Sequence, residues 1–496
     1  MKKYSIGLLF LFLINCFAFT GTAQIRTLSF TLDDVIMIAR DQSPRAIMAK
    51  HRFRGSYWEY RTHKAKFRPS LTLTGTLPDL NRSIDKITLP DGTDAFVERS
   101  LATYAVSASL RQNIAPTGGS IFMSSEMQRI DLLREDQTAS NYLSTPVSIG
   151  IRQPIKAHNS YRWERKIEPL KYQAAQKSYV ESLEQVNMLA VEYFFQLALA
   201  QVNLQIAELN YNNNDTLYQI AKGRYNIGTI AENELLQMEL AFLTSSTDLN
   251  QSGIQLEINK FRLRSFLGYN ENVDIELIIP AEIPELEVDV ARALEQAHDN
   301  NPTIIEMQRD LLEADASVAE AKAERGLQAD LFASFGLTHQ SPVIANVYQG
   351  TQDQERLRVG LEVPILDWGL AKGRHKMAQS NQEVTRVNVM QDGIDFDQEV
   401  MLQVMQFNLQ DDQLRIAAKS DTVAQMRYNV TKQRFYIGKI DVTDLNIALR
   451  ERDDATRQYL MAMQNYWSYF FNIRRLTLYD FERDLPLTED YKALVE

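Results

Sequence analysis

The chain repeats one short motif 210 residues apart, and this repeat limits the folds that the chain can adopt. Residues 224–236 read RYNIGTIAENELL, and residues 434–446 read RFYIGKIDVTDLN. The same spacing aligns residues 150–155 with 360–365, and a spacing of 258 residues aligns three further pairs: Ile36 with Leu294, Ala39 with Ala297, and Pro44 with Pro302. Motifs that recur in one order indicate an internal duplication. Each half is predicted to contain a helix, a strand region, a strand ended by proline, a long helix, a glycine turn and a second long helix.

This pattern divides the chain into five segments. We predict a signal peptide at 1–23, a first repeat at 24–268, a crossover linker at 269–289, a second repeat at 290–482 and a C-terminal tail at 483–496. The first repeat carries roughly 48 more residues between its strands than the second, the difference between the two spacings. Part of this excess is an additional strand region at about residues 100–146.

The N-terminus has the composition of a cleavable export signal. Lys2 and Lys3 precede an apolar run from Ile6 to Phe19, and small residues follow up to Ala23. Cleavage after Ala23 removes the single cysteine, so the exported chain must gain its stability from size or assembly rather than from disulfides. The alternative is an uncleaved anchor. A net charge of −11 without any basic stripe argues against a nucleic-acid partner.

The stretch from Tyr161 to Tyr225 predicts one very long helix that contains a single glycine, Gly223. At 1.5 Å per residue, its length is on the order of 100 Å. One apolar stripe advances in steps of three and four residues through Leu183, Val186, Ala190, Tyr193, Leu197, Ala200, Leu204 and Ala207. A second stripe lies nearly opposite, and polar residues such as Glu184, Asn187, Gln196 and Gln201 lie between the two. We therefore expect apolar neighbours on two sides and water on the other two, as in a helical wall; the alternative is an ordinary buried helix.

Four segments alternate apolar and polar residues with the period of a strand. They lie at residues 71–77, 147–152, 331–337 and 357–363. A membrane barrel strand has this pattern, and so does a half-buried strand of a soluble protein. Four strands cannot close a barrel alone, so several chains would have to share one sheet. Two more strand-like runs, 104–114 and 120–127, either lengthen such a barrel or project beyond it.

Several segments resemble the TolC-type outer-membrane efflux proteins. Similar segments of that family correspond to FTLDDVIMIARDQSP at 30–44, to its counterpart in the second half, VARALEQAHDNNP at 290–302, and to PILDWGLAKGR at 364–374. The ordered repeat extends the resemblance over nearly the whole mature chain. The resemblance implies a mainly α fold with a membrane β-barrel and duplicated helix–strand–strand–helix halves. It further implies a trimeric twelve-stranded β-barrel that is continuous with a long periplasmic α-helical barrel.

The same resemblance implies a function and partners. The chain would form the outer-membrane exit duct of a tripartite efflux or type I secretion system, and it would conduct substrates passively from an inner-membrane pump. The implied partners are two further copies in a homotrimer, outer-membrane lipid, a periplasmic adaptor (membrane fusion) protein and an inner-membrane pump of the RND or ABC type. The implied location is the outer membrane, with a large periplasmic portion.

The repeated turns are the predicted gate, because each antiparallel helix pair must reverse direction once and glycine is favoured just past a helix end. The family forms its closed periplasmic mouth from these tips, and the residues selected here are Asp444, Asp441, Phe435, Arg434, Gly438, Arg224, Gly228 and Glu234. Asp444 best matches an aperture acid of the family, although Ile447 stands where the family has a second acid. Three Asp444 side chains in a ring would attract cations; alternatively, Asp444 only solvates the start of a helix. Arg224 and Arg434 either pair with tip acids and latch the closed state or are solvated.

Other site predictions are few. Arg152, Arg358 and Glu362 are candidates for the polar interior of the barrel, since they alternate with apolar residues. No HExxH, Walker or GxGxxG motif occurs in the sequence, the six histidines are scattered, and acid pairs such as Asp453–Asp454 are interpreted as solvated. We predict a non-enzyme without cofactor or metal. The alternative function is a periplasmic coiled-coil scaffold without a pore, and the sequence does not indicate the cargo or which pump is used.

Overall fold

The computed structural model describes residues 27–133, 138–269, 274–280, 286–437 and 439–495. The predicted signal peptide and Gly438 lie outside the described residues. None of the described helices combines the length and the apolar composition of a helix that crosses a membrane.

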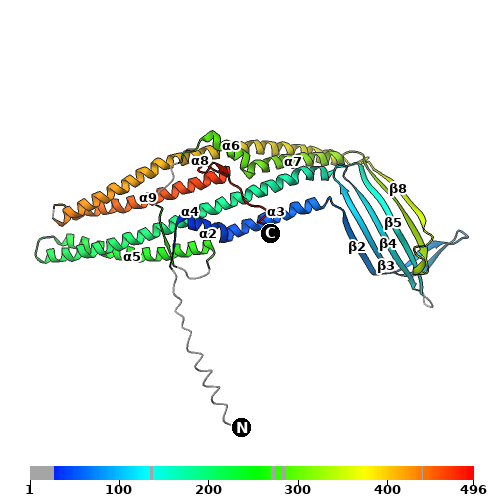
Figure 1. Cartoon of the computed structure of the whole chain (residues 1–496), viewed down its shortest axis with the longest axis horizontal. Helices are drawn as coiled ribbons and strands as arrows, with labels where there is room; N and C mark the ends of the chain where they lie inside the picture. The colour runs from blue at the N-terminus through cyan, green and yellow to red at the C-terminus, as the bar shows by residue number, and fades with distance from the viewer. Residues whose placement is uncertain (1–26, 134–137, 270–273, 281–285, 438, 496) are drawn as a thin grey trace, which may run out of the picture. The chain divides into compact units, whose positions relative to one another are not determined.

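The two halves of the chain repeat one series of elements (Figure 1). The first half contains β1 (Thr27–Phe30), α2 (Leu32–Gln42), α3 (Pro44–Ala65), β2 (Ser70–Thr88), β3 (Asp94–Ile114), β4 (Gly119–Leu133), β5 (Thr138–Lys156), α4 (Ser160–Asn226) and α5 (Glu232–Leu267). The second half contains β6 (Asp274–Leu277), α6 (Val290–Asn300), α7 (Pro302–Glu324), β7 (Gln328–Ser341), the 3₁₀ helix η1 (Ile344–Asn346), β8 (Gln352–Glu362), α8 (Leu370–Tyr436), α9 (Val442–Thr477), β9 (Tyr479–Asp480) and β10 (Leu485–Pro486). Helices α4 and α8 have 67 residues each, and α5 and α9 have 36 each. These matched lengths confirm the duplication.

The aligned residues of the repeat occupy equivalent places. Pro44 and Pro302 are the first residues of α3 and α7, a position where proline loses no helical hydrogen bond. Ala39 and Ala297, near the ends of α2 and α6, are both fully buried. The long helix was expected to contain no proline, and this is wrong: α4 contains Pro169 and continues through it to Asn226.

Six of the strands form an antiparallel sheet in the order β2-β3-β4-β5-β7-β8 (Figure 1), while β1 pairs with β6 and β9 with β10. Strands β3 and β4 come from the additional region of the first half, and they lie within the sheet between β2 and β5. The expectation of four strands per chain, on which the count of twelve rested, is therefore corrected to six, because each added strand finds a pairing partner on both sides. Pro154 does not end its strand: β5 continues to Lys156 across an irregularity in its pairing with β7.

The two faces of this sheet differ in chemistry. In an antiparallel pair, side chains directly opposite each other share a face. One face carries an exposed apolar side chain on every strand: Leu73, Leu110, Met123, Ile149, Phe335 and Leu357. The other face is largely polar and includes Thr72, Ser109, Ser124, Ser148, Ser334 and Arg356. The alternation predicted for four segments is thus present in β2, β5, β7 and β8, and β3 and β4 share it.

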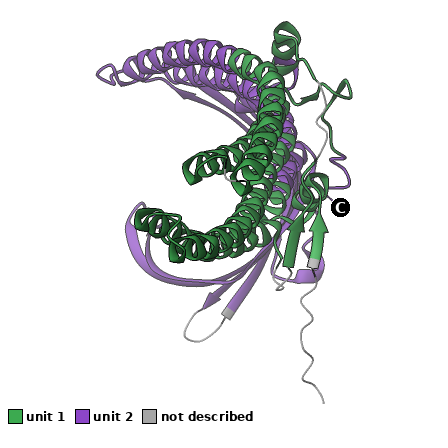
Figure 2. Ribbon diagram, turned by 90° about the vertical axis from the view of Figure 1, so that its left-hand side faces the viewer, with its two compact units in different colours: residues 1–51, 179–297, 400–489 green, residues 52–178, 298–399, 490–496 purple. Residues whose placement is uncertain are grey.

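The chain divides into two compact units that do not coincide with the halves (Figure 2). Unit 1 contains residues 1–51, 179–297 and 400–489, and unit 2 contains residues 52–178, 298–399 and 490–496. Unit 2 holds the six-stranded sheet, whereas unit 1 holds α5 and α9, the C-terminal parts of α4 and α8, and the parallel pair formed by β1 and β6. Each unit therefore combines segments from both halves.

The core of unit 1 lies between the long helices. Most of the first predicted stripe of α4 is buried, including Leu183, Val186, Ala190 and Leu197. In the second half, the Phe407 ring of α8 lies 5.3 Å from that of Tyr466 on α9. The apolar periodicity therefore identified the packing face of α4.

The prediction that Glu184 and Asn187 face water is wrong, because both are 1% exposed. The Glu184 carboxylate is paired with two arginines, Arg474 at 3.1 Å and Arg40 at 3.3 Å. A buried carboxylate is tolerated when hydrogen bonds and opposite charge replace its water. Sequence periodicity placed Glu184 between two apolar stripes, but it did not indicate that arginines rather than water cover that side of the helix.

Candidate functional site

The tip of the first hairpin is a glycine turn between α4 and α5. Gly228 has a φ of 73°, in the left-handed region that glycine adopts without strain. Its N–H donates to the Tyr225 carbonyl oxygen at 2.9 Å, and the Thr229 N–H donates to that of Arg224 at 3.0 Å. These bonds satisfy carbonyl groups that the end of α4 leaves free.

The tip of the second hairpin repeats this geometry and adds a side-chain cap. The Lys439 N–H donates to the Arg434 carbonyl oxygen at 3.0 Å, which matches the bond from Thr229 to Arg224. Asp441 precedes α9, and its side chain accepts a hydrogen bond from the Asp444 N–H at 2.9 Å. At the equivalent place before α5 stands Ala231, which has no side-chain cap. The capping residue of α9 is therefore Asp441, and Asp444 lies in the first turn of the helix.

The predicted charged tip residues lie at the surface. Asp444, Asp441, Glu234, Arg224 and Arg434 are all exposed. Within the described part of the chain, neither arginine makes an ion pair. The predicted latch between these arginines and tip acids is therefore not formed within the described part of the chain.

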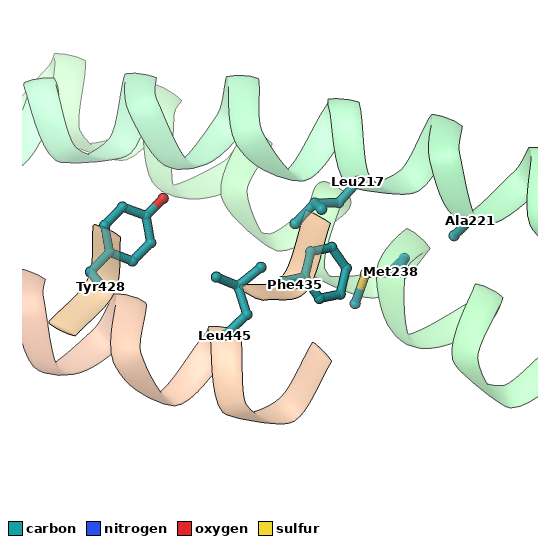
Figure 3. Close-up of a cluster of buried hydrophobic side chains, with 6 residues drawn as sticks. All are labelled: Leu217, Ala221, Met238, Tyr428, Phe435 and Leu445. Carbon is teal, nitrogen blue, oxygen red and sulfur yellow. The ribbon is translucent and has the colours of Figure 1, made fainter. Parts of the chain in front are cut away.

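Phe435 lies inside a cluster that joins the two hairpins. It is 7% exposed, and the other buried members are Leu217, Ala221, Met238, Tyr428 and Leu445 (Figure 3). Leu217, Ala221 and Met238 come from α4 and α5, whereas the rest come from α8 and α9. Phe435 therefore contributes apolar packing between the hairpins.

Sequence reasoning missed a polar link beside this cluster. Asp453 on α9 accepts a hydrogen bond from the Asn210 side chain on α4 at 2.8 Å. The Arg452 Nε donates to Asp453 at 2.9 Å, and its guanidinium carbon lies 4.4 Å from the centroid of the Tyr428 ring. The Asn213 amide donates to the Tyr428 hydroxyl at 3.4 Å. These contacts connect the two hairpins close to their tips.

Asp453 had been interpreted as solvated, and this interpretation is wrong: the side chains of Arg452 and Asp453 are 8% and 7% exposed. The signal that could have found them is spacing. Leu445, Ala448, Arg452 and Ala455 follow one another at steps of three and four residues, so Arg452 falls within the buried stripe of α9. A charged residue within an apolar stripe is buried on packing, so it needs a buried hydrogen-bonding or oppositely charged partner.

The sheet of unit 2 positions the three residues predicted for a barrel interior. Arg152 on β5 lies directly opposite Phe332 on β7, and Phe332 lies opposite Arg358 on β8. Glu362 is four residues further along β8 and lies opposite Gln328. All three predicted residues therefore project from the polar face of the sheet. Among the described residues, no cluster of three or more His, Cys, Asp or Glu is arranged to hold a metal ion.

Comparison with known proteins identifies the family. The family model described as "Outer membrane efflux protein" matches residues 35–269 and 293–477, one segment in each half. A search of curated protein sequences found no match.

Solved structures share the fold. The chain is similar to the CmeC outer membrane channel of Campylobacter jejuni, with 15% identity and a TM-score of 0.65 over 93% of this chain and 88% of that one. It is similar to the outer membrane protein VceC of Vibrio cholerae, with 13% identity and a TM-score of 0.62 over 90% and 95% of the two chains. It also resembles the open state of the MtrE outer membrane channel of Neisseria gonorrhoeae, with 14% identity and a TM-score of 0.60 over 90% and 88%.

These matches confirm the resemblance that the repeat and the quoted motifs had suggested. The family model covers both copies of the repeat, and the similar structures extend over the sheet as well as the long helices. The chain belongs to the outer membrane efflux protein family.

Proposed function

We propose that three copies of this chain form a passive exit duct in the outer membrane, closed by their helical tips on the periplasmic side. The observation that carries this proposal is the exposed apolar face of the six-stranded sheet. Leu73 and Leu357, on the two edge strands, are each 74% exposed. A continuous apolar face of this kind needs a cover, and hydrocarbon provides one.

The open edges of the sheet support assembly. Strands β2 and β8 each pair on one side only in the described sheet, and unpaired strand edges do not occur in lipid. Because the sheet has an even number of antiparallel strands, β8 of one copy runs antiparallel to β2 of the next, and the ring closes. Three sheets of six strands supply eighteen, more than the twelve expected for the family.

The helical hairpins would form the periplasmic part of the duct. Exposed apolar side chains along α5, such as Leu240, Leu243 and Phe261, are suited to contacts with a neighbouring copy. We further propose that the hairpin tips bind a periplasmic adaptor, which connects the duct to an inner-membrane pump of the RND or ABC type. The energy for transport then comes from the pump, and the duct itself carries out no chemical reaction.

The gate is proposed at the tip of the second hairpin. Asp444 is exposed in the first turn of α9, and its backbone is held by the Asp441 cap. Three such carboxylates brought together would attract cations and repel one another. The buried link of Arg452, Asp453 and Asn210 would hold the two hairpins of each copy together in the closed state.

The test is single-channel conductance of the purified protein in a planar bilayer, compared with an Asp444→Ala variant. We expect heat-modifiable trimers in outer-membrane fractions and a small, cation-preferring conductance whose preference and divalent block weaken in the variant. If stable pores form and the Asp444→Ala substitution does not change their conductance or ion preference, the duct is supported and the gate at Asp444 is disproved.

The competing function is a periplasmic scaffold without a pore. It would explain the long helices, but it leaves the apolar face of the sheet uncovered. If a folded trimer gave no conductance, even after Arg452→Met had broken the buried link, the scaffold would replace the duct as the better explanation.

A further inference from the structure

Four arginines project from the polar face of the sheet on two neighbouring rungs of the strand pairing. Arg111 on β3 lies opposite Phe122 on β4, and Arg152 on β5 lies opposite Phe332 on β7. Phe332 in turn lies opposite Arg358 on β8, and Arg356 is two residues further along that strand. Because opposite and alternate residues share a face, all four guanidinium groups lie on the same side of the sheet. We call these four arginines, with Phe122 and Phe332, the arginine layer.

The two aromatic rings form the centre of this layer. Phe122 and Phe332 are stacked, with their centroids 5.7 Å apart and their planes 21° apart. The guanidinium carbons of Arg152, Arg356 and Arg358 lie 5.9, 5.8 and 5.8 Å from the centroid of Phe332. Gly150 leaves room for this stack, since a Cβ there would approach the Phe122 ring to 2.4 Å.

The charges of the layer are not balanced by acids. Within the described residues, none of the four arginines makes an ion pair, and all four are exposed. Other arginines of the same sheet are paired: Arg82 with Glu98 at 3.5 Å, Arg99 with Asp85 at 3.4 Å and Arg129 with Asp131 at 2.8 Å. Asp330, Glu362 and Glu126 share the polar face; the Asp330 carboxylate is turned against Gly360, and Glu362 and Glu126 each lie four residues along the strand from the layer. The layer therefore carries an excess of positive charge.

We propose that the arginine layer binds organic anions in transit through the duct. The planar guanidinium groups would bind a carboxylate, sulfonate or phosphate group by paired hydrogen bonds, and the rings of Phe122 and Phe332 would receive a flat apolar body. This inference rests on the proposed function, because the polar face lines the interior only if the sheet closes into a barrel. Three copies would then place twelve arginines on two neighbouring rungs of the barrel and favour anions there, in contrast to the acidic tips.

The experiment is an equilibrium titration of the purified trimer, in non-ionic detergent, with naphthalene-2-sulfonate. We expect saturable binding to the wild type and a loss of affinity of about tenfold or more in the double variant Arg152→Gln/Arg358→Gln, which removes two charge-assisted contacts. Arg82→Gln removes one positive charge from the same sheet outside the layer and should bind as the wild type does. The neutral naphthalene-2-sulfonamide should bind more weakly to the wild type than the sulfonate.

Two results would overturn the inference: no saturable binding to a folded trimer, or equal affinity in the wild type and the double variant. The Phe332→Leu variant separates stacking from charge. It should lower the affinity for naphthalene-2-sulfonate more than the affinity for methanesulfonate, because only the former has a ring that can stack. Bilayer conductance measured on the same preparations reports on the duct independently. If the protein forms pores but does not bind the sulfonate, only anion binding by the arginine layer is disproved. If a folded trimer never conducts, the proposed function is disproved.

Discussion

The two helical hairpins share one backbone plan but hold their long helices together with different chemistry. In the α4–α5 hairpin, Tyr218 stacks on Phe242 with ring centroids 5.9 Å apart and planes 11° apart. At the positions 210 residues later, Tyr428 meets the guanidinium group of Arg452, whose central carbon lies 4.4 Å from the ring centroid. The tyrosine is retained in both hairpins, while its partner changes from a ring to a cation.

This change alters what the pair can do. Phe242 offers only apolar and aromatic contact, whereas Arg452 also donates hydrogen bonds to Asp453 and to Asn210 of the other hairpin. Since Asp453 is buried, the charge of Arg452 is needed to compensate it. The comparison teaches that a duplicated unit can keep its packing geometry while one copy acquires a charged link to the other.

The largest effect is expected from Arg452→Met, which keeps an unbranched apolar stem but leaves Asp453 buried without a cation. We expect the free energy of opening of the α9 tip to fall by about 3 kcal/mol, measured by hydrogen exchange of its backbone amides. The equivalent change in the first hairpin, Phe242→Leu, should cost about 1 kcal/mol, because it removes only an aromatic contact.

The double variant Arg452→Met/Asp453→Leu is the control for this prediction. It replaces both charges by apolar groups and should recover much of the lost stability. If Arg452→Met and Phe242→Leu lowered the free energy of opening by the same amount, the Tyr428–Arg452 pair and the Tyr218–Phe242 pair would contribute equally to the stability of their hairpins.

An intermediate effect is expected at the turn of the first hairpin. Gly228→Ala forces a residue with a Cβ into the left-handed region, and it should lower the stability of the tip by about 1.5 kcal/mol. A Cβ at this position meets nothing within 4 Å, so the cost comes from the backbone alone. Gly228→Asn, which tolerates this conformation better, should cost less in the same hydrogen-exchange measurement, and an equal cost would point to another cause.

The smallest effect concerns the caps that distinguish the two tips. Asp441→Ala removes the hydrogen bond to the Asp444 N–H and should increase the opening of the first turn of α9 by about 1 kcal/mol. The reciprocal change, Ala231→Asp, should stabilise the start of α5 by up to a similar amount, because Ala231 already has the extended backbone of a capping residue. In a variant that carries both substitutions, the first turn of α5 should become more stable than the first turn of α9. If neither substitution changes the rate of amide exchange, the cap does not determine the difference in stability between the two tips.

Much of the fold could be predicted from local pattern. The apolar stripe with Leu183 and Leu197 gave the buried face of α4, and the motif around Gly228 gave the position of the turn. The candidate site was only partly predictable. Asp441 and Asp444 are exposed at the tip as expected, but Arg452 and Asp453 were missed. Their sequence neighbours are charged, and their partners Asn210 and Tyr428 are far away in the chain.

The sequence by itself determined the duplication, the long helices, the alternating strands and the glycine turns, because each of these depends on residues close together in the chain. Only the tertiary structure decided that β3 and β4 lie between β2 and β5, that Glu184 is enclosed by Arg40 and Arg474, and that four arginines share one face of the sheet on neighbouring rungs. Periodicity states which side of an element a residue occupies. It does not state which distant element covers that side, and burial and charge pairing depend on that cover.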